Sequence, residues 1–206
     1  MKRMLTIGAV VISAALLRGC EEDTKTTGGQ APGVPRVTGR DASYVATPQD
    51  VVERMLQLAK VGKDDVVYDL GCGDGRIVVT AAAKHGCKAA GFDTDPALVQ
   101  RAKQNAEKQG VGALVTIEQK DVFSLDLSPA TVVTLYMGRG VNRRLIPQLE
   151  KLQPGSRVVS HMYEIEGREP DDVVEMISAE DRVRHVIYLW TMPFGTKPAG
   201  QNGGSP

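Results

Sequence analysis

The sequence has few cysteines, no net charge and no recognisable metal-binding cluster, and each absence excludes a class of protein. Its 206 residues include only 3 cysteines, too few for a disulfide framework, so we expect free thiols at Cys72 and Cys87. Without Lys2, Arg3 and Arg18, 22 of the 25 basic residues remain, against 25 acidic ones. This balance gives no electrostatic footprint for DNA or RNA, so we expect no nucleic-acid partner. We expect no metal, because the sequence has no cluster of metal-binding residues.

Long apolar runs are also scarce, and the first residues differ from the rest. Lys2 and Arg3 precede an uncharged run over 4–17, which is too short for a comfortable membrane span and is typical of a secretory signal. Leu17-Arg18-Gly19-Cys20 resembles a bacterial lipoprotein signal, in which Cys20 would be lipidated. We therefore expect membrane anchoring in the cell envelope. Because Arg18 departs from that pattern, a cytoplasmic domain on an uncleaved anchor is the alternative.

Composition divides the chain into four parts. After the signal or anchor segment at 1–20, residues 21–43 are rich in Thr, Gly, Pro and charge, which predicts a flexible linker. Residues 44–194 carry the apolar periodicity of one domain, and 195–206 resemble the linker, which predicts a disordered tail. We expect this domain to be a monomer.

The domain alternates between predicted strands and helices. Helices are expected over about 48–61, with Thr47 as the cap and Pro48 in the first turn, and over 75–85, 96–109 and 141–152. Strands are expected over 66–69, 89–92, 114–118, 131–135, 157–161, 173–177 and 183–191. This order predicts an α/β sandwich with a mostly parallel sheet, to which the last two strands add an antiparallel edge.

The stretch 66–76, Val-Val-Tyr-Asp-Leu-Gly-Cys-Gly-Asp-Gly-Arg, joins a buried strand to a helix through a glycine turn. Such a turn places a nucleotide-like ligand against the backbone at the carboxyl end of the strand. Dinucleotide fingerprints require a third glycine five positions after the first. Arg76 stands there, counting from Gly71, which disfavours a dinucleotide oxidoreductase, and no Walker lysine follows.

The acid-x-Gly-x-Gly-x-Gly pattern of this turn resembles motif I of the class I S-adenosylmethionine-dependent methyltransferases. The resemblance implies the Rossmann-like seven-stranded methyltransferase sandwich, with S-adenosylmethionine as the cofactor. It places one acid and the turn itself in the cofactor site: Asp69, Gly71, Cys72, Gly73 and Gly75.

Acids also end the next two predicted strands. Asp93 lies about 20 residues beyond the turn, where a carboxylate can accept bonds from both ribose hydroxyls; its alternative role is a helix cap, although Asp95 suits that role better. Thr94 is placed beside it in the site. Asp121 stands where this class of enzyme places an acid on the adenine amino group, with Val122 flanking the ring; the alternative is a loop aspartate. Asp69 would complement the positive charge of the methionine end.

A narrower resemblance covers about 44–193. Tyr-Val-Ala-Thr-Pro before the first helix, the motif I turn, Val-Val-Thr-Leu-Tyr and Val-Val-Ser-His resemble a small lysine methyltransferase group. That group includes the mitochondrial enzymes that modify the ATP synthase c subunit and the adenine nucleotide translocase. The resemblance implies that Tyr44, Thr47 and Pro48 border the methionine end of the cofactor, and that the acceptor is a protein lysine. The segment Met137-Gly-Arg-Gly140 departs from the group, as does Met162.

Tyr136 and His161, at the ends of two predicted strands, are the groups best placed to contact an amine that must lose a proton. Both also suit purely structural roles, and we expect His85 and His185 to be structural or solvent-facing. The alternatives to lysine methylation are a methyltransferase with a small-molecule or other acceptor, and a non-catalytic nucleoside-binding protein of the same fold.

Overall fold

The computed structural model describes residues 44–195. The predicted signal or anchor with Cys20, the predicted linker and all but the first residue of the predicted tail lie outside the described residues. Within 44–195, no helix is long and apolar enough to cross a membrane. Cys72 and Cys87 are buried free thiols, as predicted.

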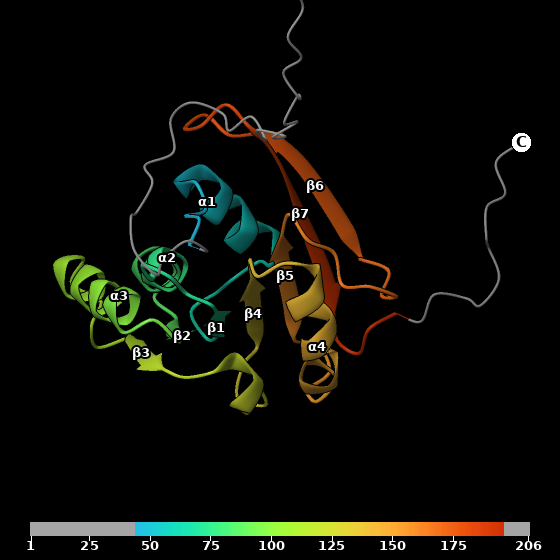
Figure 1. Cartoon of the computed structure of the whole chain (residues 1–206), viewed down its shortest axis with the longest axis horizontal. Helices are drawn as coiled ribbons and strands as arrows, with labels where there is room; N and C mark the ends of the chain where they lie inside the picture. The colour runs from blue at the N-terminus through green and yellow to red at the C-terminus, as the bar shows by residue number, and fades with distance from the viewer. Residues whose placement is uncertain (1–43, 196–206) are drawn as a thin grey trace, which may run out of the picture. The chain divides into compact units, whose positions relative to one another are not determined.

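The elements follow the predicted alternation (Figure 1). The helices are α1 (Gln49–Leu58), α2 (Arg76–His85), α3 (Pro96–Lys108) and α4 (Arg139–Leu149), with a 3₁₀ turn η1 (Val122–Ser124). The strands are β1 (Val66–Leu70), β2 (Lys88–Asp93), β3 (Val115–Gln119), β4 (Val132–Leu135), β5 (Arg157–His161), β6 (Asp172–Ile177) and β7 (Arg184–Thr191).

All seven strands form one sheet in the order β3-β2-β1-β4-β5-β7-β6. The strands β1 to β5 are parallel, whereas β7 runs antiparallel to both β5 and β6. This confirms the predicted fold class with its antiparallel edge. The order reverses at β1, so the crevice for a ligand lies beyond the carboxyl ends of β1 and its neighbours β2 and β4.

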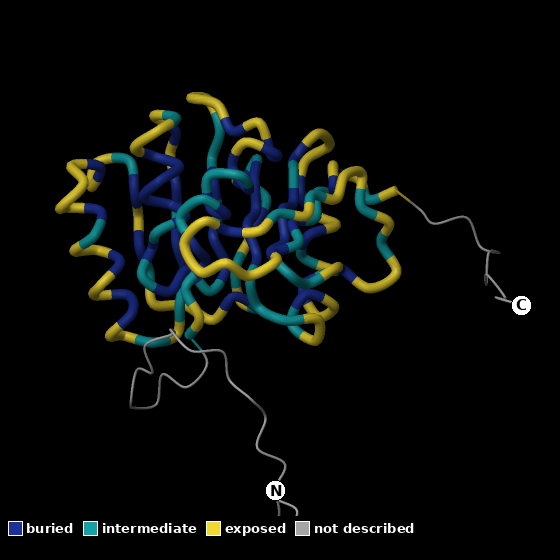
Figure 2. Tube along the Cα trace, turned by 90° about the horizontal axis from the view of Figure 1, so that it is seen from above, coloured by how far each residue is buried: buried dark blue, intermediate teal, exposed yellow. Residues whose placement is uncertain are grey.

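Each face of the sheet has its own core. Val132 and Val159 pack in the core that the sheet shares with α1, α2 and α3, whereas the neighbouring Val133 and Val158 pack in the other core, to which α4 contributes Leu145. Successive side chains of a strand point to opposite faces, so β4 and β5 serve both cores. Figure 2 shows the buried strands at the centre, with exposed positions on the outer turns of the helices.

Thr47 does not cap α1, contrary to the prediction. The helix begins after Pro48, which makes no side-chain cap, and the Thr47 hydroxyl instead contacts the ring of His161. The turn between β6 and β7 contacts the N-terminal end of α1, where the Asp50 carboxylate accepts from the Ser178 hydroxyl and the Ala179 N–H. Asp95 caps α3 as predicted, accepting from the first N–H groups of the helix.

Candidate functional site

A cavity of about 820 Å³ lies at the carboxyl ends of β1, β2, β3 and β4. Cavities of this size hold nucleoside-sized ligands. Acids predominate among the polar groups of its wall, and aromatic, apolar and backbone groups complete it. The lining residues are Tyr44, Val45, Thr47, Asp69, Gly71, Cys72, Asp74, Arg76, Ile77, Asp93, Thr94, Asp95, Pro96, Leu98, Asp121, Val122, Phe123, Tyr136 and Met137.

The glycine turn is shaped by its neighbours as much as by a ligand. A Cβ on Gly73, whose φ is +55°, would lie 2.1 Å from Cε2 of Tyr44, and one on Gly75 would lie 2.8 Å from the Cβ of Ala102 on α3. Gly73 therefore makes room for the Tyr44 ring, and Gly75 lets α3 approach the turn. Both stand behind the wall, which Gly71 and Cys72 supply directly.

Asp69 is the buried acid of the cavity. It is 3% exposed and accepts a hydrogen bond of 2.7 Å from the Thr134 hydroxyl on β4. Burial raises its pKa to about 7, and the carboxylates of Asp93 and Asp74 add to the shift. No cation contacts this carboxylate among the described residues. A ligand cation beside it would restore its ordinary ionisation.

Asp93 and Asp121 line the same cavity from β2 and from the end of β3. Asp93 organises the turn: its Oδ2 accepts from the Gly73 N–H at 2.9 Å, and its Oδ1 accepts from the Asp95 N–H. Each oxygen retains acceptor capacity for a ligand hydroxyl. Asp121 accepts from the Phe123 N–H and begins η1, so the predicted loop role and a ligand role are compatible in one side chain.

The sequence reading missed the pair Asp74 and Arg76. The Arg76 guanidinium forms an ion pair with Asp74 at 2.7 Å and donates to the carbonyl oxygen of Thr47, also at 2.7 Å. It thereby ties the segment before α1 to the glycine turn and closes that side of the cavity. An acid and an arginine two residues apart inside the turn were the available signal.

The two predicted acceptor-contacting groups are in contact with each other, but only one lies in the wall. Tyr136 lines the cavity, and its ring centroid is 4.1 Å from that of His161. His161 is fully buried and does not line the cavity; it lies behind Tyr136 and Thr47. Burial, with a smaller contribution from His185, lowers the pKa of His161 to about 3, so this ring is neutral at physiological pH. Burial also raises the pKa of Tyr136, which keeps its proton.

The remaining predicted residues divide similarly. Thr94 and Val122 line the cavity, whereas Pro48 does not. His185 is 6% exposed, which excludes the solvent-facing alternative and leaves the structural one. Met137, which the sequence marked only as unusual, lines the wall and fills the space beside Gly71. Within the described part of the chain, no group of acids, histidines and cysteines could hold a metal ion.

These groups suit a ligand that combines a cation with a nucleoside. The buried Asp69 offers a counter-charge, Asp93 offers acceptor oxygens beside the turn, and the N-terminus of α2 follows the turn at Arg76, where a helix favours an anionic group. S-adenosylmethionine carries all three features: a sulfonium with an ammonium, a ribose and a carboxylate. The fit depends on the wall as a whole, since none of these acids alone is diagnostic.

Comparison with known proteins gives the same assignment. A family model described as the ANTKMT methyltransferase domain matches residues 69–172, which is half of the chain. The match begins at Asp69, the first residue of the acid-glycine motif, and ends in β6.

Two relatives illustrate the range of the family. A protein-lysine N-methyltransferase of Saccharolobus islandicus is 46% identical over 72% of this chain and 92% of its own length. The adenine nucleotide translocase lysine N-methyltransferase of Mus musculus is 34% identical over 69% of this chain. The match spans only 63% of the mouse protein.

A solved structure supports both the fold and the ligand. The crystal structure of an RNA methyltransferase from Salinibacter ruber, in complex with S-adenosyl-L-homocysteine, is 47% identical to this chain. It aligns with a TM-score of 0.68 over 72% of this chain and 94% of its own. A geranyl diphosphate methyltransferase at 14% identity, with a TM-score of 0.57, shares the fold alone.

Proposed function

Because the chain belongs to the ANTKMT family of S-adenosylmethionine-dependent methyltransferases, we propose that it transfers the methyl group to the side-chain nitrogen of a lysine in a protein. The observation that carries this proposal is the match to the Saccharolobus protein-lysine N-methyltransferase, which extends over 92% of that protein. The cavity supports it, because Tyr136, which follows β4, and Thr47, which precedes α1, line it together with the acids proposed for the cofactor.

S-adenosylmethionine supplies a methyl group that is already activated by its sulfonium. The residues of the chain are left to bind, align and exclude water. Asp69 faces the positive charge of the cofactor, and Asp93 and the glycine turn fix the ribose side. Tyr136 keeps its proton and therefore acts as a wall and a hydrogen-bonding group for the incoming amine, and not as a phenolate base. A lysine side chain, with an ordinary pKa of about 10.4, loses its proton before attack.

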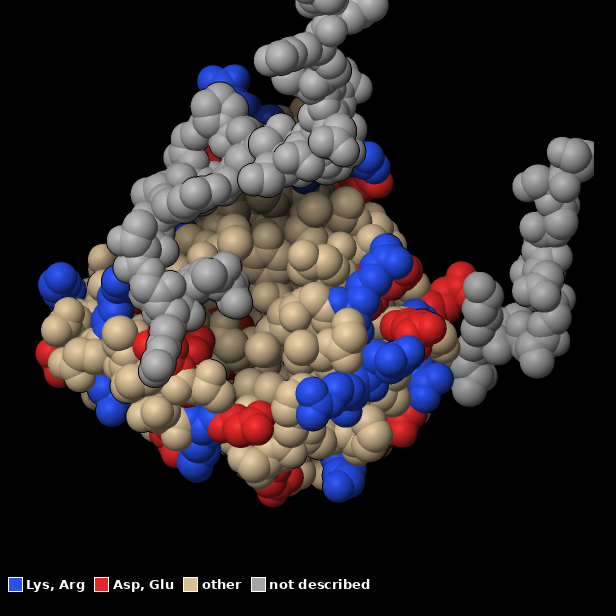
Figure 3. All heavy atoms as spheres, in the orientation of Figure 1, with Lys and Arg blue, Asp and Glu red and all other residues tan. Residues whose placement is uncertain are grey.

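The Salinibacter relative makes an RNA acceptor the second candidate. The charges beside the cavity disfavour it. On α4, Arg139 lies 3.4 Å from Glu164, and Arg143 lies 3.4 Å from Glu166. Figure 3 shows blue and red side chains interspersed over this side of the molecule. Phosphate backbones bind where several arginines and lysines are free to neutralise them.

Labelling distinguishes the acceptors. We would incubate the full chain and methyl-labelled S-adenosylmethionine with an extract of the source cells, divided into samples treated with protease, ribonuclease or neither. We expect label in protein, removed by protease only, and a mass shift on lysine in the digested product. Asp93→Ala serves as the inactive control. Label that ribonuclease removes would establish the RNA acceptor instead, and label in neither polymer would point to a small molecule.

We further propose that the domain is a monomer anchored at the cell envelope through Cys20. The positive start, the short apolar run and the Leu-x-Gly-Cys order over 17–20 support the anchor. Mass spectrometry of the mature N-terminus is the test: a lipid on Cys20 is expected, and an intact Met1 would mean an uncleaved anchor or none. Gel filtration of the full chain in detergent, with light scattering, would test the monomer.

A further inference from the structure

A continuous line of hydrogen bonds runs from the cavity wall to the surface. The Thr47 hydroxyl lies 3.2 Å from Nδ1 of His161, and Nε2 of His161 lies 2.8 Å from Nδ1 of His185. Nε2 of His185 lies 3.1 Å from a carboxylate oxygen of Asp181. We refer to these four residues, Thr47, His161, His185 and Asp181, as the histidine chain. Thr47 lines the cavity, whereas the other three members do not.

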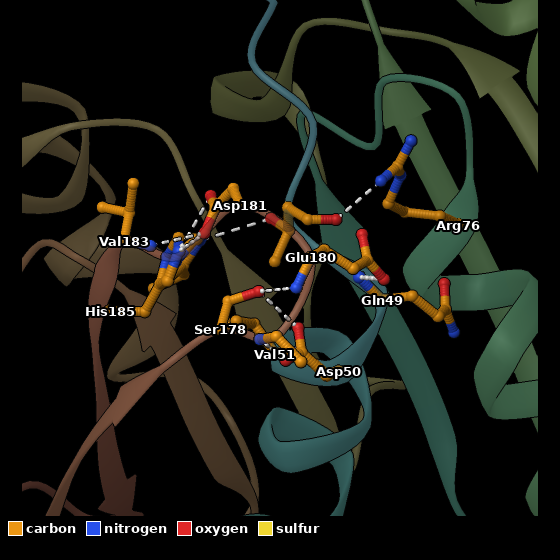
Figure 4. Close-up of polar contacts among 12 residues, drawn as sticks. Gln49, Asp50, Val51, Arg76, Ser178, Glu180, Asp181, Val183 and His185 are labelled. Atoms are coloured by element: carbon orange, nitrogen blue, oxygen red, sulfur yellow. Dashed lines mark hydrogen bonds and ion pairs between the residues drawn. The ribbon is translucent and has the colours of Figure 1, made fainter. Parts of the chain in front are cut away.

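The histidine chain lies between two parts of the fold. His161 ends β5 and His185 lies on β7, while Thr47 precedes α1 and Asp181 belongs to the turn between β6 and β7. Figure 4 shows this turn against the first residues of α1, with dashed contacts at Asp50 and Gln49. The Gln49 N–H donates to Glu180 at 2.8 Å, next to the bonds that Asp50 accepts. The two ends of the chain are therefore fixed relative to each other.

The chemistry of the outer end sets the direction of every bond. Hydrogen bonds from the Val183 N–H and from His185 outweigh the effect of burial and lower the pKa of Asp181, so this group is a carboxylate and can only accept. His185 must then donate from Nε2. When its ring is neutral, its Nδ1 accepts, so Nε2 of His161 donates and Nδ1 of His161 accepts from the Thr47 hydroxyl. All donors point outward.

We propose that Asp181 and His185 are positioning residues, which act through His161 to fix the Thr47 oxygen as a hydrogen-bond acceptor toward the cavity, where it binds a cationic or neutral N–H group. Thr47 lines the cavity, and its only proton is engaged by His161. The negative charge of Asp181 polarises the hydrogen bonds of the histidine chain, which increases the negative character of the Thr47 oxygen. A nitrogen that gains positive charge is thereby favoured.

Two ligands carry such an N–H group: the ammonium of the cofactor's methionine end and the amine of the acceptor. The second source rests on the proposed lysine function; the first does not. The shared prediction is that removing the hydroxyl, or the charge that fixes its direction, weakens the binding of one of them. Separate measurements with S-adenosylhomocysteine and with the labelled protein acceptor distinguish the two sources.

Histidine tautomers report the direction of these hydrogen bonds directly. The whole protein contains only 3 histidines, so long-range ¹H–¹⁵N spectra of the full protein labelled on histidine are easily assigned. At pH 7 we expect His161 and His185 both to carry the proton of their hydrogen bonds on Nε2. A His185 protonated on both nitrogens, or His161 protonated on Nδ1, would reverse the chain and overturn the proposal.

Matched variants test the effect on binding. Thr47→Val, which keeps the shape but removes the hydroxyl, should weaken S-adenosylhomocysteine about tenfold in calorimetry, or lower labelling of the protein acceptor about tenfold at unchanged cofactor affinity. Thr47→Ser should recover most of either loss. Asp181→Asn should lower the same quantity about threefold and mix the tautomers, whereas Asp172→Asn, at an exposed acid at the start of β6, should do neither.

The outcomes separate the two proposals. Suppose that the wild-type enzyme labels a protein acceptor and that Thr47→Val and Asp181→Asn change neither cofactor affinity nor this labelling. The histidine chain is then structural only, and the lysine function stands. If no protein is labelled yet Thr47→Val weakens S-adenosylhomocysteine, the lysine function fails and the chain serves the cofactor ammonium. If no protein is labelled and Thr47→Val leaves the affinity for S-adenosylhomocysteine unchanged, both proposals fail.

Discussion

The cavity has two halves that are built in different ways. The cofactor half, at the ends of β1, β2 and β3, is assembled from short loops: Asp93 reaches the Gly73 N–H across only 20 residues. The other half has Tyr136 and Thr47 in its wall, and we call it the acceptor half after the proposed role of Tyr136. Behind this wall Thr47 contacts His161, 114 residues further along, and His161 contacts His185. The first half is one supersecondary unit with fixed spacings, whereas the second exists only once β5 and β7 pair and α1 packs against them.

Asp93→Ala should have the largest effect on the cofactor half. It removes the proposed acceptor for the ribose together with the bond to the Gly73 N–H, and hydrogen bonds to a charged group contribute roughly 1.5–3 kcal/mol each. We expect S-adenosylhomocysteine affinity to fall about 100-fold in calorimetry, while NAD does not bind the wild-type protein. Asp126→Ala, at an exposed acid away from the cavity wall, is the control. Unchanged affinity in Asp93→Ala would remove the ribose assignment.

Gly73→Ala tests whether the two halves meet at Tyr44. The new Cβ would lie 2.1 Å from the Tyr44 ring at a left-handed φ of +55°, so both the backbone and the ring must move. We expect the free energy of unfolding to fall by about 3 kcal/mol in urea titrations, with cofactor affinity reduced as well. Gly112→Ala, where nothing lies within 4 Å of the added Cβ, is the matched control. Equal effects in both variants would contradict the contact.

This difference between the halves explains what could be predicted from the sequence. Strand alternation, the glycine turn and the acids at the ends of β1 to β3 follow from local patterns, and the structure brings Asp69, Asp93 and Asp121 into one cavity. His185 could not be read in the same way. Its bond to Asp181, four residues earlier, is local, but its contact with His161 depends on the β5–β7 register.

Thr47 illustrates the limit from the other side. A threonine before a proline and an acid is a good helix-capping pattern, yet a long-range partner takes the hydroxyl. Local propensity predicts a helix that begins at about residue 48, and α1 begins at Gln49. Which group the side chain bonds was decided by tertiary packing, which no window of sequence contains.

The pH dependence of Asp69→Asn sharpens the electrostatic contrast. Because the pKa of Asp69 is raised to about 7 in the folded protein, its protonated form is favoured there, and this stabilising contribution is lost as pH rises from about 4 to 7. Denaturant titrations should show this loss, about 4 kcal/mol, in wild type and not in Asp69→Asn. In contrast, cofactor affinity should increase over that interval in wild type only. A wild-type stability that is flat with pH would contradict it.

His161 gives the opposite sign in the acceptor half. Its pKa is lowered to about 3, so the neutral ring stabilises the fold above the ordinary histidine pKa of about 6.5, and that contribution is lost as pH falls toward 3. His161→Gln should remove this acid sensitivity and leave the Asp69 dependence above pH 4 intact. If one substitution altered both, the two halves would be electrostatically coupled.

Two buried or half-buried asparagines allow the smallest but most direct comparison. Asn105 on α3 donates to the Asp74 carbonyl at 2.9 Å in the cofactor half, whereas the fully buried Asn142 on α4 donates to Ser160 Oγ and to the Tyr163 carbonyl behind the acceptor half. Oδ1 of Asn142 lacks a partner among the described residues, so its removal offsets part of the lost bonds. Each alanine variant should therefore lower the free energy of unfolding by only about 1 kcal/mol.

The difference between the two variants lies in binding. Asn105→Ala loosens the glycine turn and should weaken S-adenosylhomocysteine about threefold. Asn142→Ala should leave that affinity unchanged and reduce methyl transfer, because it frees the segment after His161 that supports Tyr163, whose ring stacks on Tyr136 at 5.9 Å between centroids. Calorimetry and labelling on the same two proteins decide it. If Asn142→Ala lowers the affinity for S-adenosylhomocysteine as much as Asn105→Ala does, the cavity acts as one unit. Cofactor binding by the motif I turn would then depend on the long-range contacts of the acceptor half.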